Sequence, residues 1–181
     1  MRPRLPRALR AALTLLATVS FFSGGPLIAF LVLPMLRLVS RDRDDYRRRC
    51  TRVLGRLHAM FAWWLRRAGL MEGPDHVPTF PGIEDGGPYL LVCNHPTFID
   101  VVLLLGAYRD LTCLVAAKWY RTVALGALLR QSAYLPGPSR PGDGDCEDDV
   151  LGAMVDHLRS GHPLLVFPEG RRSLPSKMLR F

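Results

Sequence analysis

The chain opens with a long apolar stretch. No charged residue occurs from position 11 to position 36, a run of 26 residues bracketed by Arg10 and Arg37. A helix needs about 20 apolar residues to cross a bilayer, so this run predicts a membrane-associated segment. A Gly-Gly-Pro sequence at 24–26 and a proline at 34 interrupt it, and these residues break or kink helices. The pattern therefore allows one spanning helix or two short helices that dip into one leaflet.

Residues 41–70 have the three- and four-residue spacing of an amphipathic helix. Arginines occupy one face, and apolar side chains occupy the other. Ser40 and the aspartates at 42 and 44 suit the helix N-terminus, and Gly69 suits its end. The apolar face is equally suited to a membrane interface and to packing on the domain that follows. We expect residues 1–70 to form N-terminal membrane-associated helices.

The rest of the chain alternates short apolar runs with helical patterns. Residues 71–88 contain four prolines and four glycines, which predicts a linker. Beyond it we expect strands at 89–93, 111–117, 133–135 and 164–167, and helices at 100–107, 122–129 and 151–158. This alternation predicts an α/β domain over residues 89–181, with a mixed, partly parallel sheet and a site at the carboxyl ends of its strands.

The distribution of charged residues also distinguishes residues 1–70 from residues 71–181. Residues 1–70 carry 14 arginines against three acids, whereas residues 71–181 carry 10 lysines and arginines against 13 acids. The net charge of +8 is therefore a property of the N-terminal part. A nucleic-acid-binding domain would carry its basic residues on the folded module, so the distribution argues against nucleic acid and favours an anionic membrane surface. The four cysteines lie far apart without ligand-spaced histidines, and we expect reduced thiols and no metal site.

Two polar clusters follow two of the predicted strands: Asn94-His95-Pro96-Thr97-Phe98-Ile99-Asp100 and Pro168-Glu169-Gly170-Arg171-Arg172-Ser173. In the first cluster, a tight turn would bring the Asp100 carboxylate to the His95 imidazole. The carboxylate would fix the tautomer and leave the second ring nitrogen to remove a proton. The same spacing also suits a structural histidine at a helix cap. Because no serine or cysteine motif for covalent catalysis is present, such a base would activate a hydroxyl of the substrate.

The second cluster has the residue types of a phosphate site. Gly170 allows close backbone approach, and Arg171 and Arg172 offer fork-shaped donors that match phosphate oxygens. Glu169 could hold the arginines in place. The alternative is a solvated loop with a charge run.

Taken together, the two clusters resemble a known family. Asn94-His95-(x)4-Asp100 and Phe167-Pro168-Glu169-Gly170-(x)-Arg172-Ser173 stand about seventy residues apart behind an apolar N-terminus. They are similar to the glycerolipid acyltransferases of the 1-acylglycerol-3-phosphate acyltransferase (PlsC-like) family, over roughly residues 75–181. The resemblance implies a single PlsC-like domain that moves an acyl chain from an acyl-CoA or acyl-carrier-protein thioester to the free hydroxyl of a lysophospholipid, in phospholipid biosynthesis. It implies no further cofactor.

The resemblance also implies roles for individual residues. His95 would be the general base and Asp100 its orienter. The residues expected to bind the substrate are Asn94, Lys118, Glu169, Gly170, Arg171 and Arg172.

The chain departs from the family pattern at three places. Arg171 stands where the family usually has threonine, and the middle motif appears only as residues 133–137 with Arg140. Family members usually continue into further strands, so we expect the strand at 164–167 to be less covered in this chain.

The resemblance and the arginine content imply a bacterial inner-membrane protein whose catalytic domain faces the cytoplasm, where thioester donors occur. Two other functions stay open from the sequence. One is a catalytically impaired, lipid-binding remnant of the same fold. The other is an acyl-thioester hydrolase in which water replaces the lipid acceptor.

Overall fold

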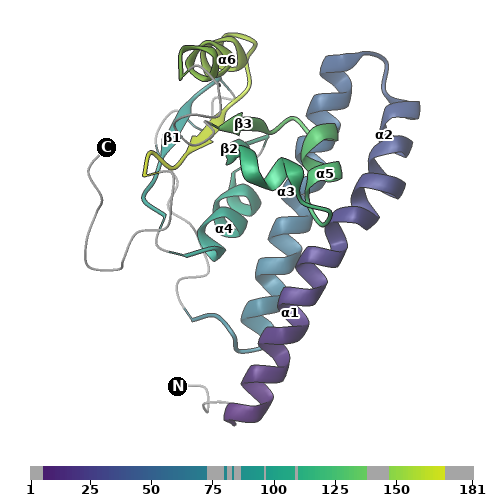
Figure 1. Ribbon diagram of the computed structural model, residues 1–181, viewed down its shortest axis with the longest axis vertical. Coiled ribbons are helices and arrows are strands. Elements are labelled where there is room, and N and C mark those ends of the chain that lie inside the picture. The colour runs from purple at the N-terminus through teal and green to yellow at the C-terminus, as the bar shows by residue number, and fades with distance from the viewer. Residues whose placement is uncertain are drawn as a thin grey trace.

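The computed structural model describes residues 6–72, 80, 83, 87–95, 97–108, 110–137 and 147–169. A hairpin of long helices lies along one side of a small α/β layer (Figure 1). The hairpin contains the apolar and arginine-rich N-terminal residues, and the layer contains the polar cluster around His95.

The apolar stretch forms one continuous helical rod, so of the two arrangements that the sequence allows, the chain is not divided into two short helices at 24–26. The rod consists of α1 (Arg7–Leu27), the π-helical turn η1 (Ile28–Val32) and α2 (Leu33–Val39). Gly25 is buried, and a Cβ there would collide with the carbonyl oxygen of Ala124, so glycine permits a close approach rather than a helix end. The π turn directly precedes Pro34, where the missing N–H and the ring would otherwise disrupt the helix.

The predicted amphipathic helix is confirmed as α3 (Arg43–Arg67), which returns alongside α1 and α2 (Figure 1). Its N-cap is Asp42, whose carboxylate accepts a 2.7 Å hydrogen bond from the Asp45 amide. Its end is marked by Gly69 at a φ of 69°, a left-handed conformation that glycine adopts at no steric cost. The apolar face buries Cys50 and Leu54 inside the molecule, which supports the packing interpretation of that face.

The sheet has four strands in the order β1-β4-β2-β3, namely β1 (Leu90–Val92), β4 (Leu164–Val166), β2 (Thr112–Ala116) and β3 (Leu135–Gly137). All pairs among these described strands are parallel, where a mixed sheet was expected. Leu164 and Leu165 are fully buried because β4 lies between β1 and β2. The strand that was expected to be less covered is thus buried at its first two residues, whereas Val166 and Phe167 are half-buried.

Four short helices complete the layer: α4 (Ile99–Ala107), the 3-10 helix η2 (Ala117–Arg121), α5 (Gly126–Gln131) and α6 (Glu147–Arg159). α5 begins four residues later than the expected helix at 122, because the chain first forms η2 and a turn. Two apolar clusters form the core. One joins the helical rod to α3 and α5, the other joins α4 to the sheet, and Tyr134 packs against both.

Candidate active site

The two polar clusters meet because their strands are neighbours. β1 and β4 run parallel with Val92 opposite Val166, and the Cys93 amide extends the pairing with a 3.1 Å hydrogen bond to the Val166 carbonyl. Residues 94–95 and 167–169 therefore leave the sheet at the same edge. This is the edge at which open parallel sheets bind their ligands.

His95 lies between an acid and an aromatic ring. Its Nδ1 is 3.5 Å from Oδ2 of Asp100, and the side chains of the two residues are 17% and 23% exposed. The Phe167 ring stacks on the imidazole with centroids 4.3 Å apart and planes 26° apart. The predicted pairing of His95 with Asp100 thus has support in the geometry, and Phe167 restricts the rotation of the imidazole. With Nδ1 on the acid side, Nε2 is the nitrogen that can act on a substrate.

Asp100 is held in place by Thr97. Its Oδ2 accepts a 2.6 Å hydrogen bond from the Thr97 amide, and its Oδ1 accepts a 2.8 Å bond from the Thr97 hydroxyl. These two bonds close a turn at the N-terminus of α4, where a carboxylate is also stabilised by the helix dipole. The acid is therefore fixed before any substrate arrives. Thr97 belongs to the first polar cluster, but no residue pattern indicates this role.

Cys93 is the cysteine closest to His95 in sequence, and its surroundings oppose a nucleophilic role. Burial raises the pKa of its thiol above the ordinary value, and the negative charge of Asp100 raises it further. A thiol needs a lowered pKa to attack as thiolate at neutral pH. The reacting nucleophile is thus better supplied by a substrate hydroxyl, as the sequence predicts.

The structure describes three of the residues expected to bind substrate. Asn94 is exposed next to His95, and Glu169 is half-buried two residues after Phe167. Lys118 is exposed on η2 beyond the end of β2, with its Nζ 5.8 Å from the Trp119 ring centroid. Gly170, Arg171 and Arg172, like Arg140 of the middle motif, lie outside the described residues. Among the described residues, no group of three or more acidic, histidine or cysteine side chains is placed to hold a metal ion.

Aromatic rings connect this turn to the helical rod. Phe98, between His95 and Asp100 in sequence, lies with its ring centroid 5.0 Å from that of Phe21 and 6.1 Å from that of Phe22. Phe22 also stacks on Trp119 of η2 at 6.3 Å. The apolar helix α1 thus reaches both the His95 turn and the segment that carries Lys118. Sequence reasoning did not find this link, because contacts between distant aromatic residues leave no local pattern.

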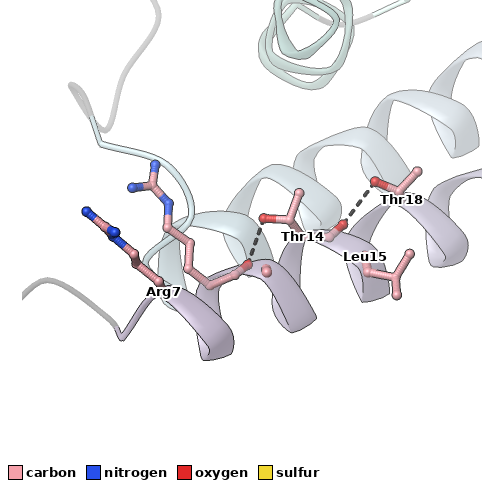
Figure 2. A pocket seen from close by; sticks show the side chains of 6 residues that line it. Arg7, Thr14, Leu15 and Thr18 are labelled. Atoms are coloured by element: carbon pink, nitrogen blue, oxygen red, sulfur yellow. Dashed lines mark hydrogen bonds between the residues drawn. The ribbon is translucent and has the colours of Figure 1, made fainter.

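A separate hollow of about 540 Å³ lies on α1, lined by Arg7, Arg10, Ala11, Thr14, Leu15 and Thr18 (Figure 2). None of the predicted site residues lines it. Its threonine hydroxyls bond to the helix itself, from Thr14 to the Arg10 carbonyl and from Thr18 to the Thr14 carbonyl. Apart from the guanidinium groups of Arg7 and Arg10, the polar side chains of the hollow bond within the helix, and no described residue of either polar cluster lines it, so the edge of the sheet at His95 is the better candidate site.

Comparison with known proteins agrees with this fold. The family model described as Acyltransferase matches residues 70–181. Among solved structures, the 1-acyl-sn-glycerophosphate (LPA) acyltransferase PlsC from Thermotoga maritima has a similar fold, with a TM-score of 0.60 and 21% sequence identity. The match covers 94% of this chain and 66% of that one, so this chain spans less than two thirds of the solved protein. A search of curated protein sequences gives no significant match.

Proposed function

The chain belongs to the Acyltransferase family, and from this premise we propose that it transfers an acyl chain from a thioester to the hydroxyl of a lysophospholipid. The acceptor would be a 1-acylglycerol-3-phosphate or a related lipid, and the donor acyl-CoA or an acyl-carrier protein. The observation that carries the proposal is the group His95, Asp100 and Phe167 at the carboxyl edge of β1 and β4.

In the proposed reaction, Nε2 of His95 takes the proton of the acceptor hydroxyl as its oxygen attacks the thioester carbonyl. The tetrahedral intermediate collapses, the carbon–sulfur bond breaks, and the leaving sulfur takes the proton from the imidazolium. The products are an ester and a thiol. Asp100, which Thr97 holds in place, keeps the ring in the tautomer that these two proton transfers need. General-base help of this kind contributes about 10²- to 10⁴-fold.

The acceptor carries a phosphate, and the cationic residues around the site suit it. We propose that Lys118, Arg171 and Arg172 bind the phosphate, with Asn94, Glu169 and Gly170 shaping the site. Lys118 lies at the carboxyl end of β2, which is the strand next to β4. Arg171 and Arg172 follow Glu169 and Gly170 in the sequence, and guanidinium groups bind phosphate oxygens through paired hydrogen bonds.

We further propose that the rod α1–η1–α2 lies in one leaflet of a membrane. Its outer face exposes large apolar side chains along its whole length, among them Leu15, Leu16, Val19, Leu27, Phe30, Leu31, Met35 and Leu38. Serine and threonine hydroxyls on the rod donate to carbonyls of the same helix, as hydrocarbon surroundings require. The inner face packs against α3 and α5, so crossing the bilayer would carry Arg130 and Gln131 of α5 into hydrocarbon. The rod has the length and hydropathy of a membrane-spanning helix, and its one-sided burial favours the in-plane arrangement.

The membrane would be the inner membrane of a bacterium, with the site on the cytoplasmic side. Thioester donors occur there, and the arginines that bracket the rod favour that side.

The test is transfer of a labelled acyl chain from acyl-CoA or acyl-carrier protein to lysophosphatidic acid by the purified chain in detergent. We expect acceptor-dependent product, and a loss of about 10²- to 10⁴-fold in His95→Ala. His162→Gln is the matched control, because His162 lies just before the amino end of β4 and next to His157 of α6, away from the carboxyl end of the strands at which His95 lies, and should leave the rate unchanged. Release of free fatty acid without acceptor would instead identify a hydrolase. If the wild-type chain and both variants are inactive with several acceptors, the result would identify a binding remnant.

A further inference from the structure

The most exposed large apolar side chain among the described residues belongs to Val123, at 94%. It lies at the tip of the turn that joins η2 to α5. Single exposed apolar residues are common on protein surfaces and need no explanation by themselves. The surroundings of Val123 are what distinguish it.

The turn around Val123 is held in one conformation by its own hydrogen bonds. The Thr122 hydroxyl donates to the Trp119 carbonyl at 2.8 Å and accepts from the Leu125 amide at 3.3 Å. The Gly126 amide donates to the Thr122 carbonyl at 2.8 Å. Because these bonds already order the backbone, presenting Val123 to a partner costs little further conformational entropy.

The turn also lies against the helical rod. The Ala124 carbonyl and the Leu125 side chain approach Gly25 so closely that α1 could carry no side chain there. Figure 1 shows the loop before α5 reaching the rod where α1 gives way to α2. Leu27 and Phe30, which follow Gly25 on the rod, are 59% and 68% exposed. The turn that carries Val123 is thus packed on the inner face of the rod, at the level of Leu27 and Phe30 on the outer face that we assign to the membrane.

The residues before Val123 have the chemistry of a membrane interface. Lys118 and Arg121 are exposed, and neither has an ion-pair partner in the part of the chain that the structure describes. Trp119 stacks on Phe22 of α1, and the Lys118 ammonium lies close to its ring. Tryptophan rings prefer the headgroup level, and lysine and arginine extend their charged ends toward lipid phosphates.

We propose that the segment Lys118–Val123 is a second membrane-contacting element, with Val123 inserted among the lipid chains and Lys118 and Arg121 bound to anionic headgroups. This inference rests on the proposed membrane association of the rod and adds to it a contact made by the catalytic domain itself. Two contacts, one from the rod and one from this segment, would fix how the domain is tilted on the membrane. The carboxyl end of β2, where η2 begins, would then face the headgroup layer that holds the lipid acceptor.

The first experiment places an environment-sensitive fluorophore at Val123→Cys in the full chain. Cys93 and Cys146 are replaced by alanine, whereas Cys50 and Cys113 are buried and can stay. Leu151→Cys is the matched control, because Leu151 is also an exposed apolar residue, at 58%, but lies on α6. With vesicles of phosphatidylcholine and phosphatidylglycerol, we expect the emission at position 123 to shift to the blue and the emission at 151 to stay unchanged.

Flotation of the unlabelled protein with the same vesicles separates the possible failures. If the protein floats but the label at 123 remains in water, the present inference is wrong and the membrane association of the rod stands. If the protein does not float, the present inference and the membrane association of the rod are both wrong. Acyl transfer measured in detergent does not depend on either of them.

A second experiment tests the contributions of the Val123 side chain and of the Arg121 charge. Val123→Asp should weaken partition into these vesicles by about tenfold or more, because a carboxylate replaces an apolar side chain at the contact. Leu151→Asp should leave partition unchanged. Arg121→Gln should weaken binding to phosphatidylglycerol vesicles and not to vesicles of phosphatidylcholine alone, whereas Arg159→Gln on α6 should affect neither. Equal partition of Val123→Asp and Leu151→Asp would overturn the proposal.

Discussion

The ring of Phe167 is the contact that restrains the face of the proposed base, whereas its acid lies near the Nδ1 edge. A carboxylate 3.5 Å from Nδ1 restrains one edge of the imidazole and leaves the ring free to tilt. The stacked phenyl ring, at 4.3 Å between centroids, removes that freedom. Orientation of a base within a few tenths of an ångström is a large part of what positioning contributes to a reaction.

We therefore expect Phe167→Ala to lower kcat by roughly 10- to 100-fold, with a smaller change in the KM for the lysophospholipid. Phe167→Tyr keeps an aromatic ring on the imidazole and should retain most of the activity. The measurement is steady-state transfer by both variants, with circular dichroism to show that each is folded. If the alanine and tyrosine variants lose activity equally, the ring does not act by stacking on His95.

Much of this site could be predicted from residues that are close in sequence. The pairing of His95 with Asp100 follows from a five-residue spacing across a strand end and a helix start. The contacts of Phe167 and Thr97 could not be predicted in the same way. Phe167 reaches His95 only because β1 and β4 pair in register over seventy residues of chain, and Thr97 bonds to Asp100 through turn geometry that no residue pattern specifies.

At the scale of elements, the α/β layer packs against the hairpin through the close crossing of α3 and α4. A Cβ on Gly106 would lie 2.7 Å from the Ala59 nitrogen and 2.9 Å from its Cα, and one on Gly55 would lie 3.2 Å from the Leu105 carbonyl oxygen. These neighbours are backbone atoms in the middle of helices and cannot move away. Glycine at position 106 therefore sets the distance at which the two helices pack.

Gly106→Ala should lower the free energy of unfolding by about 1–3 kcal/mol, because the overpacked methyl group outweighs the better helix propensity of alanine. Gly152→Ala is the matched control. It lies on the exposed face of α6 with nothing within 4 Å of the added Cβ, so we expect a gain of about 0.5–1 kcal/mol. Thermal unfolding in one detergent checks both, and a shift of the same sign in the two variants would contradict the packing argument.

The order of helices and strands was predictable, whereas interruptions within them were not. The Gly-Gly-Pro sequence at 24–26 indicates a break when only α1 is considered. The turn at 122–125, a hundred residues away, gives Gly25 its actual role as a point of close approach. Likewise, the start of α5 at Gly126 rather than at 122 reflects hydrogen bonds of the preceding turn that propensity does not contain.

At the scale of the whole molecule, His157 connects three parts of the sheet layer. It is 4% exposed on α6, and its Nε2 lies 2.6 Å from the Thr112 hydroxyl of β2. That hydroxyl donates its single proton to the Pro163 carbonyl, just before β4, at 2.8 Å. Nε2 must therefore carry a proton and donate it to the Thr112 hydroxyl.

This arrangement predicts how stability depends on pH. Burial, together with the nearby His162 and Arg47, lowers the pKa of His157 to about 4. In the unfolded chain a histidine has a pKa of about 6.5, so between pH 6.5 and pH 4 the unfolded state binds the additional proton. Stability from this group is fully present above pH 6.5 and is lost as the pH falls through that window, by up to about 1.4 kcal/mol per pH unit.

The measurement is the unfolding free energy in detergent from pH 7 to pH 4.5, for the wild-type chain and for His157→Gln. Glutamine keeps an N–H donor for Thr112 and cannot titrate, so the variant should show a shallower loss of stability on acidification. The groups that face this region, Asp44, Arg47, Arg48, Asp110 and His162, are common to both proteins, and their contributions cancel in the difference. Identical slopes would mean that His157 takes up its proton over the same pH range in the folded and the unfolded chain, and so is charged in the folded protein below about pH 6.5. In that case its contact with Thr112 could not hold α6 to the sheet through a neutral imidazole.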